Sequence, residues 1–500
     1  MRASVQDLDI VPAELEPAGR VAELQRYVPL IVWGVAALTV IFICLRILGT
    51  GFLPAGDARR HVAKAFTDRP YTEIVVMRPE YTMDHSPGWE CLLRFLRKTS
   101  GWNADALMSF SIAVTLLCMF LAPLPWVRRP EAWLAALLAQ MVAIPELMGR
   151  LTQARPYLLS EAILIAILFS WTKQDETQKP SWPKLIGTSI ALTLSVWMHG
   201  AWYLWVLPIA AFLMSGKWRS GMWLSGCWIA GTIAGALLTS RPIEFLKQAL
   251  LIASSISKEH VPTSILVGEF RPSYGEFTTL AMVLLVSIWR RQQNTKAASA
   301  LGGPVFWMMV IAWILGFKAD RFWADWGVPA VLVWLTLVFE EMAVNAWPVV
   351  SWRRVVASGV VAVPLFWHST NDLDRRYSYS LNEVFLDFRQ PELKPWMPDS
   401  QGIFYSDSMV FFYNTFYKNP QGDWRYIVGM EPALMPEPDL QVFRSIQMNP
   451  NSFKAYEPWV QKLSPADRLE VSCSAQPNLP ELEWTNAATG IWIGRLPKGH

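Results

Sequence analysis

The stretch that decides the fold is VPLIVWGVAALTVIFICLRI (residues 28–47), together with the segment LGTGFLPAGDARRHVAKAF (48–66) that follows it. A hydrocarbon core of roughly 30 Å needs about 20 apolar residues in a helix, and the first segment supplies such a run. The second segment soon becomes polar, so we expect Asp57 at the membrane surface. Together they predict a transmembrane helix that delivers a carboxylate to one face of the bilayer.

The composition of the whole chain agrees with a membrane protein. Hydrophobic residues make up 52% of it and charged residues only 17%, against about 25% charged in ordinary soluble proteins. The 27 Trp residues favour the membrane–water interface. The net charge of +3 is too small to indicate nucleic acid as a partner. Residues 1–25 are polar and acidic, and we expect the first apolar run to stay as an anchor, with no secretory signal peptide.

Further apolar runs predict a mainly α fold, a polytopic membrane helical bundle of about eleven spans. They lie at about 28–47, 106–126, 132–148, 157–171, 183–198, 201–215, 221–239, 278–289, 304–317, 327–340 and 355–367. With a cytoplasmic N-terminus, every predicted inner loop carries at least two Lys or Arg, as the positive-inside rule expects. The stretch 183–215 is either two short helices around an outer turn or one broken helix, and only two helices keep this charge pattern.

The same topology predicts how the chain is divided. Residues 1–27 form a cytoplasmic tail, and 28–367 form the transmembrane domain, with long extracytoplasmic loops at 48–105 and 240–277. Residues 368–500 form an extracytoplasmic domain. Within it, 402–406, 425–429 and 489–494 read as strands and 409–419 and 439–449 as helices, so we predict a small α/β domain. The expected location is the plasma membrane, specifically a bacterial inner membrane.

The first outer loop contains most of the charged and histidine residues that we consider as site candidates. Asp57 opens a short predicted helix, which also contains Arg59, Arg60, His61 and Lys64. A second helix begins after Asp84 and His85, with Ser86 as the expected N-cap and Pro87 in the first helical position. Apolar residues then recur with helical spacing beside basic ones, which is typical of a helix in the interface. This much positive charge outside runs against the usual trend, and lipid phosphate is the obvious anion at that depth.

In this plan the chain resembles the GT-C superfamily of membrane glycosyltransferases, which includes protein O-mannosyltransferases and the 4-amino-arabinose transferases of lipid A. The resemblance rests on the acidic residue just after the first span, the two interfacial helices and the Asp-His-x-Pro-like turn. GRLTQARPYLL (149–159), HG (199–200) and KADRFWADWGVPA (318–330) resemble family segments that face outward. It covers roughly residues 28–370, while the tail resembles no family that we can name.

The resemblance implies a polyprenyl-phosphate sugar donor and transfer on the extracytoplasmic face to a hydroxyl of a glycan, lipid or protein acceptor. Asp57 would take the hydroxyl proton, and inversion would follow from attack opposite the leaving phosphate. Arg suits a lipid phosphate better than Lys. The candidates at outer helix ends are Arg59, Arg155 and Arg321. Asp84 or His85 would position the acceptor or bind a metal, and His61 and His199 are further binding candidates. We expect no cofactor and no metal, although a divalent cation stays possible.

Each of these residues also has a purely structural interpretation. Asp57 could only cap its helix, Asp84 could only open the turn before Pro87, and the histidines could make structural hydrogen bonds. Arg155 and Arg321 could be interface anchors. In the second long loop, Glu259, His260, Glu269 and Arg271 could gate a lipid site. The competing functions are a lipid or glycan transporter or flippase, and a non-enzymatic subunit of an envelope glycan assembly complex.

Overall fold

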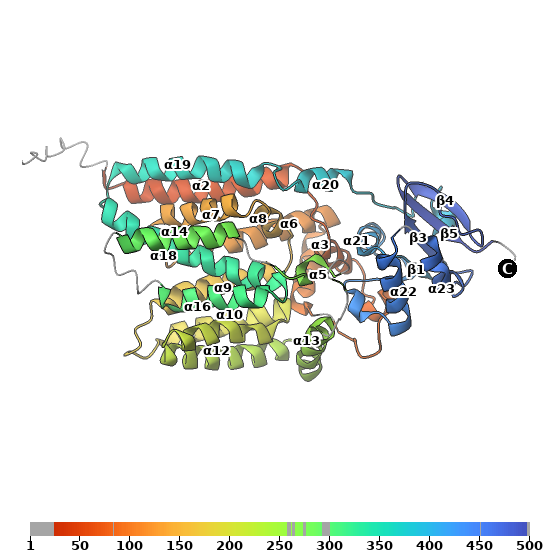
Figure 1. Cartoon of the computed structure of the whole chain (residues 1–500), viewed down its shortest axis with the longest axis horizontal. Helices are drawn as coiled ribbons and strands as arrows, with labels where there is room; N and C mark the ends of the chain where they lie inside the picture. Colours follow the sequence, from red (N-terminus) through yellow and green to blue (C-terminus); the bar gives the residue numbers. More distant parts are fainter. Residues whose placement is uncertain are drawn as a thin grey trace, which may run out of the picture.

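The computed structural model describes residues 25–83, 85–257, 262, 266–273, 277–292, 301–450 and 452–497. Figure 1 shows two parts: a bundle of helices running along the long axis of the molecule, and a smaller α/β domain at one end of the bundle. The helices between them belong to the first long loop and to the C-terminal region. The predicted mainly α fold with a small C-terminal α/β domain is therefore confirmed at this level.

Each of the predicted apolar runs falls on helical structure. The helices concerned are α2 (Val28–Gly49), α6 (Ala104–Leu121), α7 (Pro130–Ala143), α8 (Leu147–Leu151), α9 (Tyr157–Thr172), α10 (Trp182–His199), η1 (Trp202–Trp205), α11 (Val206–Met214), α12 (Trp218–Leu237), α14 (Phe277–Gln292), α16 (Pro304–Gly316), α18 (Val328–Ala346) and α19 (Trp352–Thr370). Among the described residues, three helices are long and apolar enough to cross a membrane: Val28–Gly49, Ala104–Leu121 and Asp320–Ala346. The bent pair Trp218–Leu237 and Pro242–Ser255 would add a fourth, so eleven crossings stays a prediction.

The outer surface of the bundle is apolar. On α2, Leu38, Phe42 and Leu45 are exposed, and on α19 Val356, Val360 and Val363 are exposed. These residues recur every three or four positions, so each helix turns one apolar stripe outward while another packs inside. An exposed apolar surface of this extent is rare on soluble monomers. It indicates that the bundle is embedded in lipid.

The chain reverses direction at the uncertain segment around residue 200. Helix α10 ends at His199, and Gly200 follows with φ of 71°. Five residues on, the Trp205 indole donates a hydrogen bond of 3.1 Å to the Ser195 hydroxyl. Ten residues of continuous helix would separate these groups by about 15 Å, so a single helix is excluded. The prediction of two short helices with a tight turn is confirmed.

The predicted inner loops lie together at one end of the bundle. Lys173 donates to the Trp126 carbonyl at 2.8 Å, and Lys217 donates to the Thr172 carbonyl at 2.6 Å. The Arg354 guanidinium forms a bidentate pair with Glu131 at 2.6 and 3.0 Å, joining α19 to α7. Because these segments meet at one end, the remaining loops meet at the other, beside the α/β domain (Figure 1).

The α/β domain contains one five-stranded sheet of order β2-β1-β3-β5-β4. The strands are β1 (Ile403–Tyr405), β2 (Arg425–Tyr426), β3 (Arg468–Ser472), β4 (Glu483–Ala488) and β5 (Ile491–Arg495), and the main helices are α21 (Met409–Lys418) and α22 (Glu437–Met448). The pairs β1–β2 and β1–β3 are parallel, whereas β3–β5 and β4–β5 are antiparallel. The sequence had predicted β1, β2, β5 and both helices, and had missed β3 and β4.

The first long loop joins the bundle to this domain. It contains α3 (Asp57–Lys64), α4 (Tyr71–Ile74) and α5 (Pro87–Ser100). Val75 forms a parallel bridge with Tyr426 at the β2 edge of the sheet, and the Val76 N–H donates to the Tyr426 carbonyl at 2.9 Å. Pro87 begins α5 as predicted, but the Ser86 side chain makes no capping hydrogen bond. The loop therefore connects bundle and tail rather than lying free in the interface.

Candidate functional site

Asp57 lies where the bundle, the first loop and the C-terminal domain meet. It is the first residue of α3, and Gly56 occupies the N-cap position with φ of 78°. The Arg60 Nε lies 3.2 Å from Asp57 Oδ1, and the Tyr413 hydroxyl of α21 donates to the same oxygen at 3.1 Å. Arg155 Nε lies 3.8 Å from Oδ2. The carboxylate does not cap the helix through its side chain and instead faces groups from three separate segments.

These neighbours keep Asp57 ionised. Burial acts to raise the pKa of the carboxyl group, but the positive charges of Arg60 and Arg155 outweigh it and hold the pKa far below its usual range. The side chain keeps 23% of its surface exposed, so it is still accessible. At neutral pH the site therefore presents a carboxylate, which can accept a proton but cannot donate one.

A chain of alternating charges extends from Asp57 along the same end of the bundle. The Arg155 guanidinium pairs with Glu269, and Arg321 Nη1 lies 4.0 Å from the other oxygen of Glu269. Arg321 Nε lies 3.1 Å from Asp325 Oδ2, and the second oxygen of Asp325 accepts a bond of 3.1 Å from Arg150 Nε. Arg155 and Arg321, both predicted as phosphate ligands, thus share one carboxylate partner.

Glu269 is held in its charged form by this arrangement. Burial raises the pKa of Glu269, but Arg155 and Arg321 outweigh that effect and lower it to about 2. Glu269 belongs to η3 (Gly268–Phe270) in the second long loop, where we had considered it as a gate residue. His260 and Glu259, the other two acidic or histidine candidates in that loop, lie outside the described residues.

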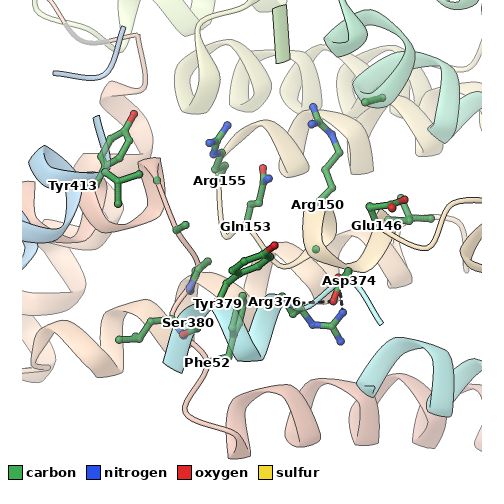
Figure 2. A pocket seen from close by; sticks show the side chains of 18 of the residues that line it. Phe52, Glu146, Arg150, Gln153, Arg155, Asp374, Arg376, Tyr379, Ser380 and Tyr413 are labelled. Atoms are coloured by element: carbon green, nitrogen blue, oxygen red, sulfur yellow. Dashed lines mark hydrogen bonds and ion pairs between the residues drawn. The ribbon is translucent and has the colours of Figure 1, made fainter. Parts of the chain in front are cut away.

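A first cavity, here called the polar cavity, opens beside Arg155 and has a volume of about 540 Å³. Figure 2 shows Arg150, Gln153 and Arg155 along one side, with Tyr413 across from them and the ion pair of Asp374 and Arg376 below. Further lining residues with hydroxyl or carboxyl groups are Tyr379, Ser380, Glu146, Asp320 and Glu383. A cavity with this many hydrogen-bonding groups suits a hydroxyl-rich ligand.

A second cavity, here called the apolar cavity, has a volume of about 370 Å³. Its walls are mostly apolar, and they include Leu204, Ile252, Phe270, Phe317, Phe322 and Trp326. Its polar groups are of another kind, namely Lys318, Arg321, His85, His199, the hydroxyl of Tyr203 and one carboxyl group, that of Glu431. Such a lining suits an amphiphile with an anionic head.

Two of the three predicted histidines lie together in this apolar cavity. The rings of His85 and His199 have their centroids 6.3 Å apart. His199 Nε2 lies 3.2 Å from Arg321 Nη2, and because a guanidinium can only donate, this nitrogen accepts the bond. His199 thus orients Arg321 toward the cavity that both residues line.

Two predicted site residues lie away from both cavities, and a third is not among the described residues. Arg59 is fully buried; it donates to Asn414 and to the Leu53 carbonyl and pairs with Glu383, so it fastens α3 to the C-terminal region and lines neither cavity. His61 is buried on α3, with Nδ1 3.6 Å from Glu90. It also lines neither cavity. Asp84 lies outside the described residues.

The structure adds residues that the sequence did not single out. Arg150 and Asp325 lie in the motif stretches 149–159 and 318–330, so their segments were noted but their roles were not. Tyr413 and Glu431 come from the tail, where no pattern pointed to a site. Among the described residues, no group of three or more His, Cys, Asp or Glu has an arrangement that could hold a metal ion.

Comparison with known proteins gives a likeness in fold. No family model matches the chain, and no curated protein matches its sequence. Among solved structures, it is similar to ArnT from Cupriavidus metallidurans bound to undecaprenyl phosphate, with 11% sequence identity and a TM-score of 0.50. The match covers 94% of this chain and 98% of that chain. At this identity the likeness concerns the fold alone, and it shows that the chain folds like ArnT over nearly its whole length.

Proposed function

We propose that the protein is a membrane glycosyltransferase that moves a sugar from a polyprenyl-phosphate donor to an acceptor hydroxyl on the extracytoplasmic face, with inversion. The observation that carries the proposal is the ionised Asp57, held between Arg60 and Arg155 at the junction of bundle and tail. Asp57 itself lines neither cavity, but Arg155 and Tyr413, which contact it, line the polar cavity, and His85, whose charge acts on it, lines the apolar cavity. The similar structure of ArnT contains undecaprenyl phosphate, which supports a ligand of the same class here.

The apolar cavity is the proposed donor site. Its walls can accept the first isoprene units of the lipid, and Lys318 and Arg321 can neutralise the phosphate. Arg321 is well suited because His199 and Asp325 fix its orientation before any ligand arrives. A guanidinium that is already oriented loses less side-chain entropy when it binds.

The polar cavity is the proposed acceptor site. Gln153, Tyr379 and Ser380 offer neutral donors and acceptors, and Arg155 joins this cavity to Asp57. An acceptor hydroxyl placed there would lie near Asp57, which would take its proton as the hydroxyl attacks the anomeric carbon on the face opposite the phosphate.

Binding of the donor would also make Asp57 a stronger base. In the free protein, Arg60 and Arg155 stabilise its negative charge, so its affinity for a proton is low. An incoming phosphate beside Lys318 and Arg321 adds a second anion to the site, and its negative charge opposes the effect of Arg60 and Arg155 on Asp57. The pKa of Asp57 would rise, and the carboxylate would accept the hydroxyl proton as the acceptor attacks.

The test compares the full-length wild type with Asp57→Asn, purified from membranes and analysed by native mass spectrometry for co-purified lipid. We expect the wild type to carry sugar-free polyprenyl phosphate, and Asp57→Asn to carry the sugar-bearing lipid, since it binds the donor but cannot turn it over. Asp68→Asn is the matched control, because Asp68 is on the same loop with its side chain 87% exposed. Finding no polyprenyl phosphate on either protein would overturn the proposal.

A further inference from the structure

Glu431 is the one acidic side chain that lines the apolar cavity among its described residues, and it comes from the C-terminal domain. It directly precedes η6 (Pro432–Leu434). The backbone around it is fixed to the first loop: Arg78 N–H donates to the Leu434 carbonyl and Arg78 Nε donates to the Met435 carbonyl, both at 2.9 Å. The main chain that carries Glu431 is therefore anchored to the first loop.

No hydrogen bond or ion pair joins the Glu431 carboxyl to another described residue, although the charges around it are many. The groups that act on it or share its cavity are Asp57 of α3, Glu269 of η3, Arg155 before α9, Arg321 of α17 (Asp320–Phe322), Tyr413 of α21, Lys318, Tyr203, His85 and His199. Burial raises the pKa of Glu431, the negative charges of Asp57 and Glu269 raise it further, and the resulting pKa is about 8. Arg321 and Arg155 act in the opposite direction.

We propose that Glu431 is a second catalytic residue, the acid that donates a hydrogen bond and then a proton to the phosphate oxygen leaving the sugar. This rests on the function proposed above, and it assigns the C-terminal domain a part in the reaction. An unpaired carboxyl group on an anchored main chain lines the same cavity as Arg321 and His199, and this position is the basis of the assignment.

The step balances as follows. The bond from the anomeric carbon to the lipid phosphate oxygen breaks, and a bond from the acceptor oxygen to that carbon forms. The acceptor proton passes to Asp57, and the Glu431 proton passes to the phosphate, which leaves as a monoanion. Exchange with solvent then returns Asp57 to its ionised form and Glu431 to its protonated form.

Asp57 and Glu431 are thus two carboxyl groups in one site with opposite tasks. Arg60 and Arg155 hold Asp57 ionised, whereas burial and two nearby anions keep Glu431 protonated at neutral pH. Environments that push two pKa values apart in this way identify a base and an acid. Because Glu431 is neutral, a second anion can also bind beside it without charge repulsion.

The test measures binding of undecaprenyl phosphate to the full-length protein in nanodiscs between pH 7.5 and 9.5, where the phosphate stays a dianion. As Glu431 ionises it repels the ligand, so we expect the wild-type Kd to rise about 10-fold per pH unit above pH 8. Glu431→Gln cannot ionise and keeps a hydrogen-bond donor, so its Kd should change less than about 2-fold. Glu437→Gln, at an exposed position in the same domain, should behave as the wild type.

A second measurement follows turnover of the co-purified sugar-bearing lipid. Glu431→Gln should retain that lipid, as Asp57→Asn does, because an amide cannot give up a proton. Normal turnover in Glu431→Gln, or an unchanged pH dependence of its Kd, would overturn the role of Glu431 and leave the proposed function standing. Failure of the wild type to bind undecaprenyl phosphate at any pH would instead overturn the proposed function itself.

Discussion

The Tyr413 hydroxyl lies 3.1 Å from Asp57 Oδ1, although 356 residues separate the two in the chain. The same hydroxyl lies 3.3 Å from the Met430 carbonyl, next to Glu431. Tyr413 therefore connects the carboxylate at the start of α3 with the segment that carries the proposed acid. Removing the tail would leave Asp57 with only its arginine neighbours, so the C-terminal domain completes the site.

Tyr413→Phe should slow turnover of the lipid-linked sugar about 10-fold. The variant keeps the ring packing but loses a hydrogen bond to a charged group, a bond usually worth about 1.5–3 kcal/mol. The rate of loss of the lipid-linked sugar in isolated membranes is the measurement. Tyr456→Phe is a matched control, because Tyr456 also donates to an aspartate, Asp407, at 3.1 Å but lies within the C-terminal domain. Equal rates in the two variants would contradict the role of Tyr413.

Arg321→Gln should weaken binding of undecaprenyl phosphate by about 10- to 100-fold, since a bond between two charged groups is lost. Arg321→Lys should restore only part of this affinity, because an ammonium group cannot reproduce the planar guanidinium contacts. Arg241→Gln, at an exposed position in the second long loop, is the control. The measurement is the Kd in nanodiscs, and an unchanged value for Arg321→Gln would move the phosphate site elsewhere.

Arg59→Ala should loosen the C-terminal domain from the bundle. Arg59 is fully buried, and its loss leaves the Glu383 carboxylate without its partner, a change that costs about 3–5 kcal/mol for buried pairs. We expect a lower apparent Tm and faster proteolysis after residue 370. Arg389→Ala removes the exposed pair with Asp387 and should leave the Tm nearly unchanged. Similar losses in both variants would show that Arg59 does not hold the domain in place.

Gly200→Ala should disturb the turn that places His199. Gly200 has φ of 71°, and a Cβ there would overlap the carbonyl oxygen of His85. Gly101→Ala is the matched control, because Gly101 has φ of 68° but open space where the Cβ would lie. The positive φ alone costs about 1 kcal/mol in both variants, so any further loss of thermal stability in Gly200→Ala measures the contact with His85. No difference in Tm between them would argue against that close approach.

Glu470→Gln should stabilise the protein increasingly as pH rises. Glu470 is fully buried in β3, and burial raises its pKa to about 7, although Ser406 and Ser472 donate to it. Its folded pKa lies above its unfolded value near 4.5, so its stabilising contribution is complete below pH 4.5 and is lost by about pH 7. The loss is on the order of 3 kcal/mol.

The measurement for Glu470 is the apparent Tm of the variant minus that of the wild type, followed from pH 5 to pH 8. The difference should grow across this range and then level off. Glu481→Gln, at an exposed position before β4, should show no such trend. A constant difference for Glu470→Gln would show that the group does not titrate in this window.

The sequence predicted the bundle because apolar composition acts locally. An apolar run as long as 28–47 is stable as a helix in the hydrocarbon core of a membrane. Each of the eleven runs falls on helical structure. The tail was harder to predict: β1 (Ile403–Tyr405) and β5 (Ile491–Arg495) contain apolar runs, but β4 (Glu483–Ala488) is a polar edge strand whose place depends on pairing with β5. The pairing of strands from separate segments cannot be predicted from the polar and apolar pattern of either segment alone.

The sequence alone thus indicated a helical membrane bundle and placed the candidate residues on its outer loops. It also singled out Asp57, Arg155 and Arg321 as candidate site residues. Only the tertiary structure decided which charges act together. Arg59 pairs with Glu383 instead of lining a cavity, and Glu269 lies between Arg155 and Arg321. Tyr413 of the tail contacts Asp57, and Glu431 of the tail lies close enough for the two carboxyl groups to affect each other. The physical reason is that hydrophobicity is a property of each segment, whereas a pKa and a binding site depend on groups that only folding brings within a few ångströms.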